Sequence, residues 1–349
     1  MTEQRALANS LHRPARAAFA RALAPAYAAL DLGTNNCRLL VGIPTRQEFR
    51  VVDSFSRPVR LGEGVQQTGQ LSPAAMERAM AALHACADRL ARRPIIMMRA
   101  IATEACRRAA NADAFLKQVE QETGLHFEVI STREEAELAL ESCAPLLANG
   151  GRRALLFDIG GGSTELAWVR LPLHRPPELI GYVSLPVGVV GLCERYGADA
   201  FTSAGFEAMV AEIATQLAAF EQVHRIGQEI RRGGVRLLGT SGTVTTLAGV
   251  VLALERYQRP LVDGRVLTRL AAQGAVEALC AMGRDGLVAH PCVGPDRADF
   301  VLPGCAIFTA IHRLWPAPDV TVADRGLREG LLMRMMRTLR QPPRLRRQP

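Results

Sequence analysis

Residues 155–166 contain the pattern that most constrains how this chain can fold. Three apolar residues lead into Asp158, and Gly160, Gly161 and Gly162 follow before a Ser-Thr-Glu segment and another apolar run. The pattern predicts a strand, a tight turn and a second strand, with Asp158 at the start of the turn. Because glycine has no Cβ and tolerates positive φ, the amides of such a turn can converge on an anion. An ordinary hairpin with a flexible turn is the alternative for this stretch alone.

A second copy of the pattern lies 127 residues earlier and argues against an ordinary hairpin. An apolar run at residues 27–30 leads into Asp31 and Gly33, then into a polar turn and a second apolar run. Two Asp-x-Gly hairpins at domain-scale separation predict an internal duplication, in which each half presents its loop to a shared cleft. We expect Asp31 and Asp158 each to orient a metal ion or a water molecule at its turn.

Predicted strands and helices alternate along both halves of the chain, and a length of 349 residues suits two domains. Strands are expected at 49–55, 57–61, 95–101, 127–130, 153–158, 164–169, 179–184 and 235–238. Helices are expected at 72–92, 112–123, 205–230, 266–282 and 297–313. Two more are expected to begin at residue 132 and after the segment 321–331. Ser72 is expected to cap the helix at 72–92, and Ser131 the helix that begins at residue 132. The alternation predicts an α/β fold.

The net charge of +8 belongs to the two ends of the chain. Residues 1–26 hold four arginines and one glutamate, and residues 334–349 hold six arginines and no acid. Solvated basic ends are the preferred interpretation, and docking onto a polyanion such as nucleic acid or polyphosphate is the alternative. Phe19 is the single aromatic residue among these arginines in the sequence, so no regular aromatic interleaving is present and no specific nucleic-acid partner is expected.

Cysteine and histidine spacing argues against a disulfide framework, a zinc site or a histidine metal site. The eight cysteines are scattered without a CxxC pair, and the seven histidines show no HxxxH or HExxH pattern. Reduced thiols in a cytoplasm are the simpler interpretation. No apolar run reaches the ~18 residues of a membrane span, so no membrane partner is expected. Residues 7–24 lack the apolar region of a secretory signal, and a transit peptide, a short helix or a disordered arm remain open there.

Six ordered motifs between residues 27 and 335 make the chain resemble the exopolyphosphatase and guanosine pentaphosphate phosphatase family. They are Asp31-Leu32-Gly33-Thr34-Asn35, Arg60-Leu61-Gly62-Glu63-Gly64, residues 130–136 with the Glu134-Glu135 pair, residues 158–165, Gly239-Thr240-Ser241-Gly242-Thr243, and residues 324–330. Two positions depart from the family pattern. Asn36 stands where the family often has Ser, and Gly191 stands where many members have a basic or polar residue.

The resemblance implies two ribonuclease-H-like lobes of the actin, hexokinase and heat-shock ATPase superfold, flanking a cleft. It divides the chain into a basic arm at 1–26, an N-terminal lobe at 27–150, a C-terminal lobe at 151–323 and a basic tail at 339–349. The helix expected at 324–338 returns to complete the first lobe. Long family members carry further helical domains, so this chain resembles the short, two-domain form, and the family implies a homodimer.

Hydrolysis of a terminal phosphoanhydride needs a positioned water, a base and neutralisation of phosphate oxygens. The resemblance implies that Glu135 is the general base. From the residues alone, Glu134 and Glu135 would more simply complement the dipole of their helix, because acids are common in first turns. The family pattern selects the second of the two glutamates.

The two glycine loops are expected to bind the substrate's phosphate groups, and their carboxylates to hold Mg²⁺ or the attacking water. Asp158 and Glu165 are the expected metal ligands, with Mn²⁺ as an alternative and K⁺ as a possible stimulating ion. The expected phosphate-binding residues are Asp31, Gly33, Thr34, Asn35, Gly160, Gly161, Gly162, Ser163 and Thr164.

Several arginines are candidates of lesser specificity. Arg107 resembles a family arginine that clamps the scissile phosphate, although it also fits a surface position on a helix. Arg38 and Arg60 are weaker candidates of the same kind. Ion pairing within Arg297–Asp299 and within Arg328–Glu329 is expected to be structural rather than catalytic.

The resemblance implies release of orthophosphate from the end of inorganic polyphosphate, with hydrolysis of the 5′-γ-phosphate of guanosine pentaphosphate (pppGpp) as the alternative. A sugar or acetate kinase of the same superfold is a rival, and the Glu134-Glu135 motif argues against it. A non-catalytic regulator that binds polyphosphate or the nucleotide is a further alternative. The retained acids at 135, 158 and 165 argue against that alternative.

Overall fold

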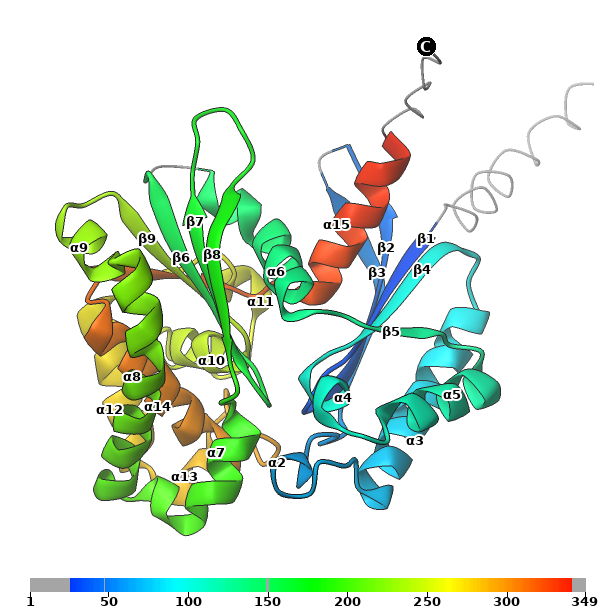
Figure 1. Cartoon of the computed structure of the whole chain (residues 1–349), viewed down its shortest axis with the longest axis horizontal. Helices are drawn as coiled ribbons and strands as arrows, with labels where there is room; N and C mark the ends of the chain where they lie inside the picture. The colour runs from blue at the N-terminus through cyan, green and yellow to red at the C-terminus, as the bar shows by residue number, and fades with distance from the viewer. Residues whose placement is uncertain (1–25, 47, 149–150, 341–349) are drawn as a thin grey trace, which may run out of the picture.

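The computed structural model describes residues 26–46, 48–148 and 151–340, which form two β-sheets with helices packed on their faces (Figure 1). The predicted α/β fold is therefore confirmed. Nearly all of the predicted basic arm and tail lies outside the described residues. Within the described ranges, no helix combines the length and the apolar character needed to cross a bilayer.

The first sheet has five strands in the order β3-β2-β1-β4-β5. They are β1 (Ala26–Leu32), β2 (Asn36–Pro44), β3 (Phe49–Pro58), β4 (Ile95–Ala102) and β5 (Phe127–Val129). The first three strands pair antiparallel, whereas β4 runs parallel to β1 and β5 parallel to β4.

The second sheet has six strands in the order β10-β11-β9-β6-β7-β8. They are β6 (Arg153–Ile159), β7 (Thr164–Arg170), β8 (Glu178–Leu185), β9 (Val235–Thr240), β10 (Val266–Thr268) and β11 (Asp319–Ala323). Five of these strands repeat the order and directions of the first sheet, with β6 in the place of β1. This repetition confirms the predicted internal duplication.

The helices cover both sheets. Those of the first half are α2 (Val65–Thr68), α3 (Pro73–Ala91), α4 (Glu104–Arg108), α5 (Ala112–Thr123) and α6 (Thr132–Leu147). Those of the second half are α7 (Val189–Tyr196), η1 (Gly197–Phe201), α8 (Ser203–His224), α9 (Ile226–Arg231), α10 (Gly242–Val251), α11 (Arg259–Val262), α12 (Arg269–Ala281), α13 (Gly283–Ala289), α14 (Ala298–Leu314) and α15 (Leu327–Arg340).

Local signals set several of these boundaries. The Ser72 and Ser131 hydroxyls accept hydrogen bonds from the amides of Ala75 and Glu134, which confirms both predicted caps. Three predicted boundaries were wrong. The strands expected at 49–55 and 57–61 form one strand that ends at Pro58, and the helix expected at 205–230 breaks where Arg225 adopts φ 49°. Residues 266–268 form a strand before α12, because they pair with β11.

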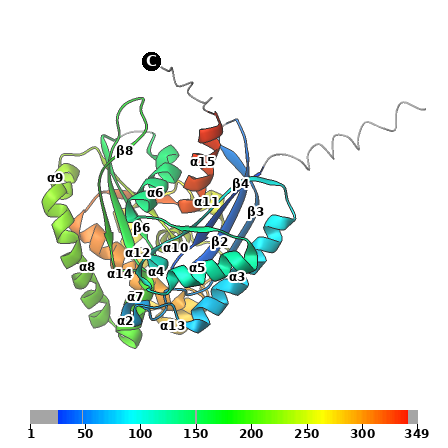
Figure 2. The same ribbon diagram turned by 45° about the vertical axis from the view of Figure 1, so that its right-hand side comes forward.

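Helices α6 and α15 lie between the two sheets (Figure 1 and Figure 2). Leu331 and Leu332 of α15 pack with Leu138 of α6 against the first sheet. The opposite side of α6 packs against β6 and β7 of the second sheet through residues that include Cys143 and Leu147. A Cβ at position 330 would overlap the Leu138 carbonyl, so the two helices approach closely only with glycine there. Helix α6 thus touches both sheets and brings its first turn to the space between them.

Candidate active site

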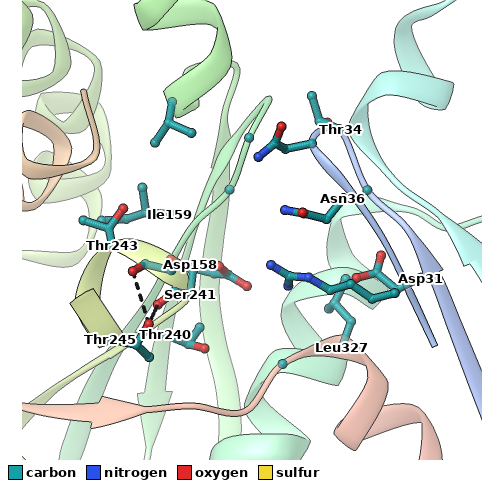
Figure 3. A pocket seen from close by; sticks show the side chains of 18 of the residues that line it. Asp31, Thr34, Asn36, Asp158, Ile159, Thr240, Ser241, Thr243, Thr245 and Leu327 are labelled. Carbon is teal, nitrogen blue, oxygen red and sulfur yellow. Dashed lines mark hydrogen bonds between the residues drawn. The ribbon is translucent and has the colours of Figure 1, made fainter. Parts of the chain in front are cut away.

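A cleft of about 340 Å³ lies between the two sheets, where β1, β6 and β9 end. Figure 3 shows Asp31, Thr34 and Asn36 on one wall facing Asp158, Ile159 and Ser241 on the other. Both walls consist largely of backbone turns and short polar side chains. Such a surface suits a small, highly charged ligand.

The two Asp-x-Gly hairpins are built in the same way. The Gly33 amide donates to the Asn36 carbonyl, and the Gly160 amide donates to the Ser163 carbonyl, each at 2.9 Å. These two amides therefore hold the turns closed and are not free to bind an anion. The hairpins differ in the residue paired with the aspartate, because Asp31 lies opposite Arg38, whereas Asp158 lies opposite Glu165.

The two glycine loops touch each other across the cleft. A Cβ on Gly162 would lie 2.7 Å from Thr34 Oγ1, and one on Gly161 would lie 3.1 Å from the Asn35 Cβ. A side chain at position 162 would thus displace the opposite loop, and one at position 161 would fit only after a small shift of Asn35. The contact closes one side of the cleft.

Glu135 reaches the cleft from the first turn of α6, and its side chain is buried. Its Oε2 accepts a hydrogen bond of 2.7 Å from Arg107 Nη1. The neighbouring Glu134 points elsewhere and forms ion pairs with Arg99 and Arg334. The structure therefore brings the second glutamate of the pair, and not the first, to the cleft.

Burial and mutual repulsion disfavour the charged forms of the carboxyl groups in the cleft. Burial, and then repulsion by Glu165, raises the pKa of Glu135 to about 8, although Arg107 opposes the shift. Burial and a neighbouring carboxylate raise the pKa of Asp158 and of Glu165 to about 7. Burial also raises the pKa of Asp31. The pKa values of Glu135, Asp158 and Glu165 thus lie near neutrality, as those of acid–base groups in active sites often do.

Arg107 does not line the cleft. Its guanidinium donates to Glu135 Oε2, to the Ile130 carbonyl at 3.0 Å and to Glu104 Oε2 at 3.1 Å. With these partners, the side chain stands behind Glu135. In this structure it contacts the expected base, and its predicted contact with a phosphate stays a prediction.

The structure brings eight of the nine expected phosphate-binding residues to the cleft. They are Asp31, Gly33, Thr34, Asn35, Gly160, Gly161, Gly162 and Ser163. The exception is Thr164, which is fully buried and donates its hydroxyl to the Val187 carbonyl at 2.7 Å. That hydroxyl anchors β7 rather than facing the cleft.

Three arginines line the cleft without forming an ion pair within the described ranges: Arg38, Arg297 and Arg328. Burial lowers the pKa of Arg297 and of Arg328, which lie close to other cationic groups. Arg38 had a signal in the sequence, since it occupies the position opposite Asp31 in the predicted hairpin. Arg297 had none, because it reaches the cleft from the loop before α14.

Both ion pairs expected between near neighbours in the sequence were wrong. Asp299 pairs with Arg284 at 2.8 Å, which leaves Arg297 in the cleft, where its Nη1 lies 3.5 Å from Thr246 Oγ1. Glu329 pairs with Arg259 at 3.0 Å. Side chains one or two positions apart at a helix point in different directions, so such neighbours seldom pair.

Three buried polar atoms at the cleft have no hydrogen-bond partner among the described residues. They are Asp31 Oδ1, Asn35 Oδ1 and Ser241 Oγ. Ser241 also has φ 87°, which is uncommon for a residue with a side chain. Unpaired buried polar atoms are rare in native proteins, and their position here is where a ligand would satisfy them.

The carboxylates of the cleft are hard oxygen donors of the type that Mg²⁺ prefers. Among the described residues, no three His, Cys, Asp or Glu side chains are arranged to hold a metal ion together. Mg²⁺ is usually bound by one or two carboxylates together with substrate phosphates. Asp158 and Glu165 would supply the protein ligands, and the unpaired Asp31 Oδ1 would face the same space.

Two repeated lobes around a shared cleft define the actin-like class of two-lobed α/β proteins. The profile of the Ppx/GppA phosphatase family matches residues 42–339, so the chain belongs to this family. This confirms the family inferred from the six motifs.

Sequence relatives include proteins named guanosine-5′-triphosphate,3′-diphosphate pyrophosphatase. The one from Vibrio vulnificus is 33% identical over 320 residues, which cover 91% of this chain and 60% of the relative. The one from Aeromonas hydrophila is 32% identical over 311 residues, or 88% of this chain and 59% of the relative. The chain thus spans about 60% of the length of the curated relatives that it matches.

Solved structures of the family have the same fold. The Aquifex aeolicus Ppx/GppA family member superposes with a TM-score of 0.75 at 26% identity, covering 91% of this chain and 99% of that one. A structure described as an exopolyphosphatase-like protein gives a TM-score of 0.82 at 26% identity, with the same coverage. The predicted superfold is therefore confirmed.

Proposed function

We propose that this protein hydrolyses the terminal 5′-phosphoanhydride of guanosine pentaphosphate and releases orthophosphate, with Glu135 as the general base. The observation that carries the proposal is Glu135 itself, a buried carboxyl group in the cleft with a pKa of about 8. The names of the sequence relatives support the nucleotide as substrate. They favour guanosine pentaphosphate, which the sequence motifs supported as the alternative to polyphosphate.

In the proposed reaction, Glu135 accepts a proton from the attacking water. The water oxygen forms a bond to the terminal phosphorus, while the bond from that phosphorus to the bridging oxygen breaks. The bridging oxygen leaves with the shortened nucleotide. A base whose pKa lies close to the working pH combines a useful deprotonated fraction with a strong tendency to accept the proton.

The remaining groups of the cleft position the phosphate and compensate its charge. Mg²⁺, when bound with the substrate, would neutralise phosphate oxygens, and Asp158 and Glu165 would hold it. Glu165 is itself oriented, because the Ser184 hydroxyl donates to its Oε1 at 2.8 Å. The loop at Thr34 and Asn35 would contact the terminal phosphate from the opposite wall.

Arg38 and Arg297 come from the two lobes and would bind further phosphate groups of the substrate. Each lacks an acidic partner among the described residues, so its charge is available to an anion. The hydroxyl of Ser241, which has no hydrogen-bond partner among the described residues, also lines this part of the cleft and offers a hydrogen bond to a nucleoside.

Inorganic polyphosphate is the second candidate substrate, because its hydrolysis uses the same attack on a terminal phosphorus. A structure at 26% identity is described as exopolyphosphatase-like, which supports this candidate. The same arginines would bind the following units of the polyanion.

A comparison of phosphate release from pppGpp, long-chain polyphosphate and GTP, each with Mg²⁺, tests the proposal. We expect the highest kcat/KM for pppGpp. A higher value for polyphosphate would contradict the choice of substrate, and no release from any of the three would contradict hydrolysis.

A further inference from the structure

A second cavity, of about 490 Å³, lies in the C-terminal half of the chain and is lined by residues of α8, α12 and α14. Figure 1 shows these three helices side by side. The cavity shares no lining residue with the cleft. Three helices that differ widely in sequence position thus enclose a space large enough for a small organic molecule.

The walls of this cavity are largely apolar and aromatic. Phe206 of α8, Val276 of α12, and Leu302 and Phe308 of α14 line it. The ring of Phe308 lies against that of His312, with 4.4 Å between the ring centroids and an angle of 30° between the planes. Surfaces of this kind bind flat aromatic rings.

His312 is an unpaired polar group in this apolar wall. The residue is only 8% exposed, and its Nε2 has no hydrogen-bond partner among the described residues. Burial, together with the nearby Arg269, lowers the pKa of His312 to about 4, so the imidazole is neutral at pH 7. An unpaired buried nitrogen beside a cavity is unusual and requires an explanation.

The charged residues of the cavity leave one cation available. Arg313 donates both Nη atoms to Glu207, at 2.5 and 2.8 Å, and Glu277 accepts a hydrogen bond from Gln273 at 2.9 Å. The exposed guanidinium of Arg269 has neither an ion pair nor a hydrogen bond within the described residues. A ligand with one anionic group would therefore complement Arg269.

We propose that this cavity is an effector site for a flat aromatic molecule that carries one anionic group. The ring would lie among Phe206, Phe308 and the neutral imidazole of His312, and the anion would pair with Arg269. This combination of an apolar space with a few polar groups is typical of small-molecule sites.

Helix α14 connects the effector site with the cleft. Arg297 precedes its first residue, and Phe300 and Val301 line the cleft, while Leu302, Phe308 and His312 line the second cavity. A ligand that changes the packing of α14 would change the position of Arg297 in the cleft. Occupancy is therefore expected to alter the KM for a phosphate substrate.

Titration with anilinonaphthalene sulfonate, a fluorescent aromatic anion, tests the site directly. We expect saturable binding that weakens about threefold to tenfold in Arg269→Ala, because a charge-assisted contact at an exposed position is lost. Arg265→Ala is the matched control, since Arg265 is an exposed arginine outside the cavity. Equal affinity in the two variants would overturn the proposal.

Two further measurements complete the test. Cys280→Phe places a ring in the cavity and is expected to abolish saturable binding, with circular dichroism confirming that the variant is folded. At saturating probe, the KM for pppGpp is expected to change by about twofold or more. Binding without any change in KM would contradict an effector role.

Discussion

The substitution Arg107→Met tests whether this arginine acts through Glu135 or on the substrate. Methionine keeps an unbranched side chain but removes the charge whose Nη1 lies 2.7 Å from Glu135 Oε2. Attraction by Arg107 lowers the pKa of Glu135 against the effects of burial and of Glu165. Without that charge, the pKa of Glu135 rises further.

The size of the effect follows from the proximity of the two groups. A cation in direct contact with a carboxylate typically lowers its pKa by about 1 to 3 units. Loss of one unit of this stabilisation reduces the deprotonated fraction of Glu135 at pH 7 about tenfold. Because the proposed base acts in its deprotonated form, kcat/KM at pH 7 is expected to fall about tenfold or more, and to recover as the pH rises.

The assay is phosphate release from pppGpp between pH 6 and 10, with kcat/KM plotted against pH. The rising limb is expected to move to higher pH by about one unit or more in Arg107→Met. Arg107→Lys keeps the charge and is expected to restore most of the profile. Arg108→Met is the matched control, because Arg108 is more exposed and pairs only loosely with Glu104, at 3.5 Å.

A uniform fall in kcat/KM at every pH, with an unchanged apparent pKa, would refute this reasoning. That result would place Arg107 on the substrate phosphate, as the family resemblance implied.

Three further predictions concern the cleft. Asp158 and Glu165 have folded-state pKa values of about 7, above their ordinary values. They therefore release their protons at a higher pH in the folded state than in the unfolded chain. The free energy of unfolding without metal should therefore fall, on the order of a few kcal/mol, as the pH rises from about 5 to 8. Urea titration measures this change, and a free energy of unfolding that rises with pH would contradict the burial argument. Gly162→Ala brings a Cβ to 2.7 Å from Thr34 Oγ1. The substitution is expected to lower kcat/KM about tenfold to hundredfold with little loss of Tm. An unchanged kcat/KM would show that the contact between the two loops is unimportant for the reaction. Arg297→Ala is expected to raise the KM for pppGpp about tenfold at similar kcat, and an unchanged KM would remove this arginine from the substrate site.

Much of the fold was predictable because its signals are local. Each Asp-x-Gly turn follows an apolar run in the sequence, and the presence of two copies predicts the duplication that the two sheets show. The helix that carries Glu135 was equally visible from Ser131, its capping residue. Turns and helix caps depend on a few neighbouring residues, so they can be predicted from the sequence.

The parts of the site that escaped prediction depend on distant contacts. Thr164 follows the glycine loop directly, but strand alternation turns it to the inner face, where the Val187 carbonyl accepts its hydrogen bond. Arg297 enters the cleft because Asp299 is engaged by Arg284, a pairing across 15 residues that no local pattern signals. The second cavity needs three helices to meet, so it has no counterpart in any single stretch of sequence.

The most direct test of the proposed mechanism replaces each member of the glutamate pair separately. Glu135→Gln keeps the shape of the side chain but removes the base, and we predict a loss of phosphate release of about a hundredfold to ten-thousandfold. Glu134→Gln, which lies one residue away and pairs with Arg99 and Arg334 outside the cleft, is predicted to keep most of the activity. Full activity in Glu135→Gln, with either pppGpp or polyphosphate, would contradict the assignment of Glu135 as the general base.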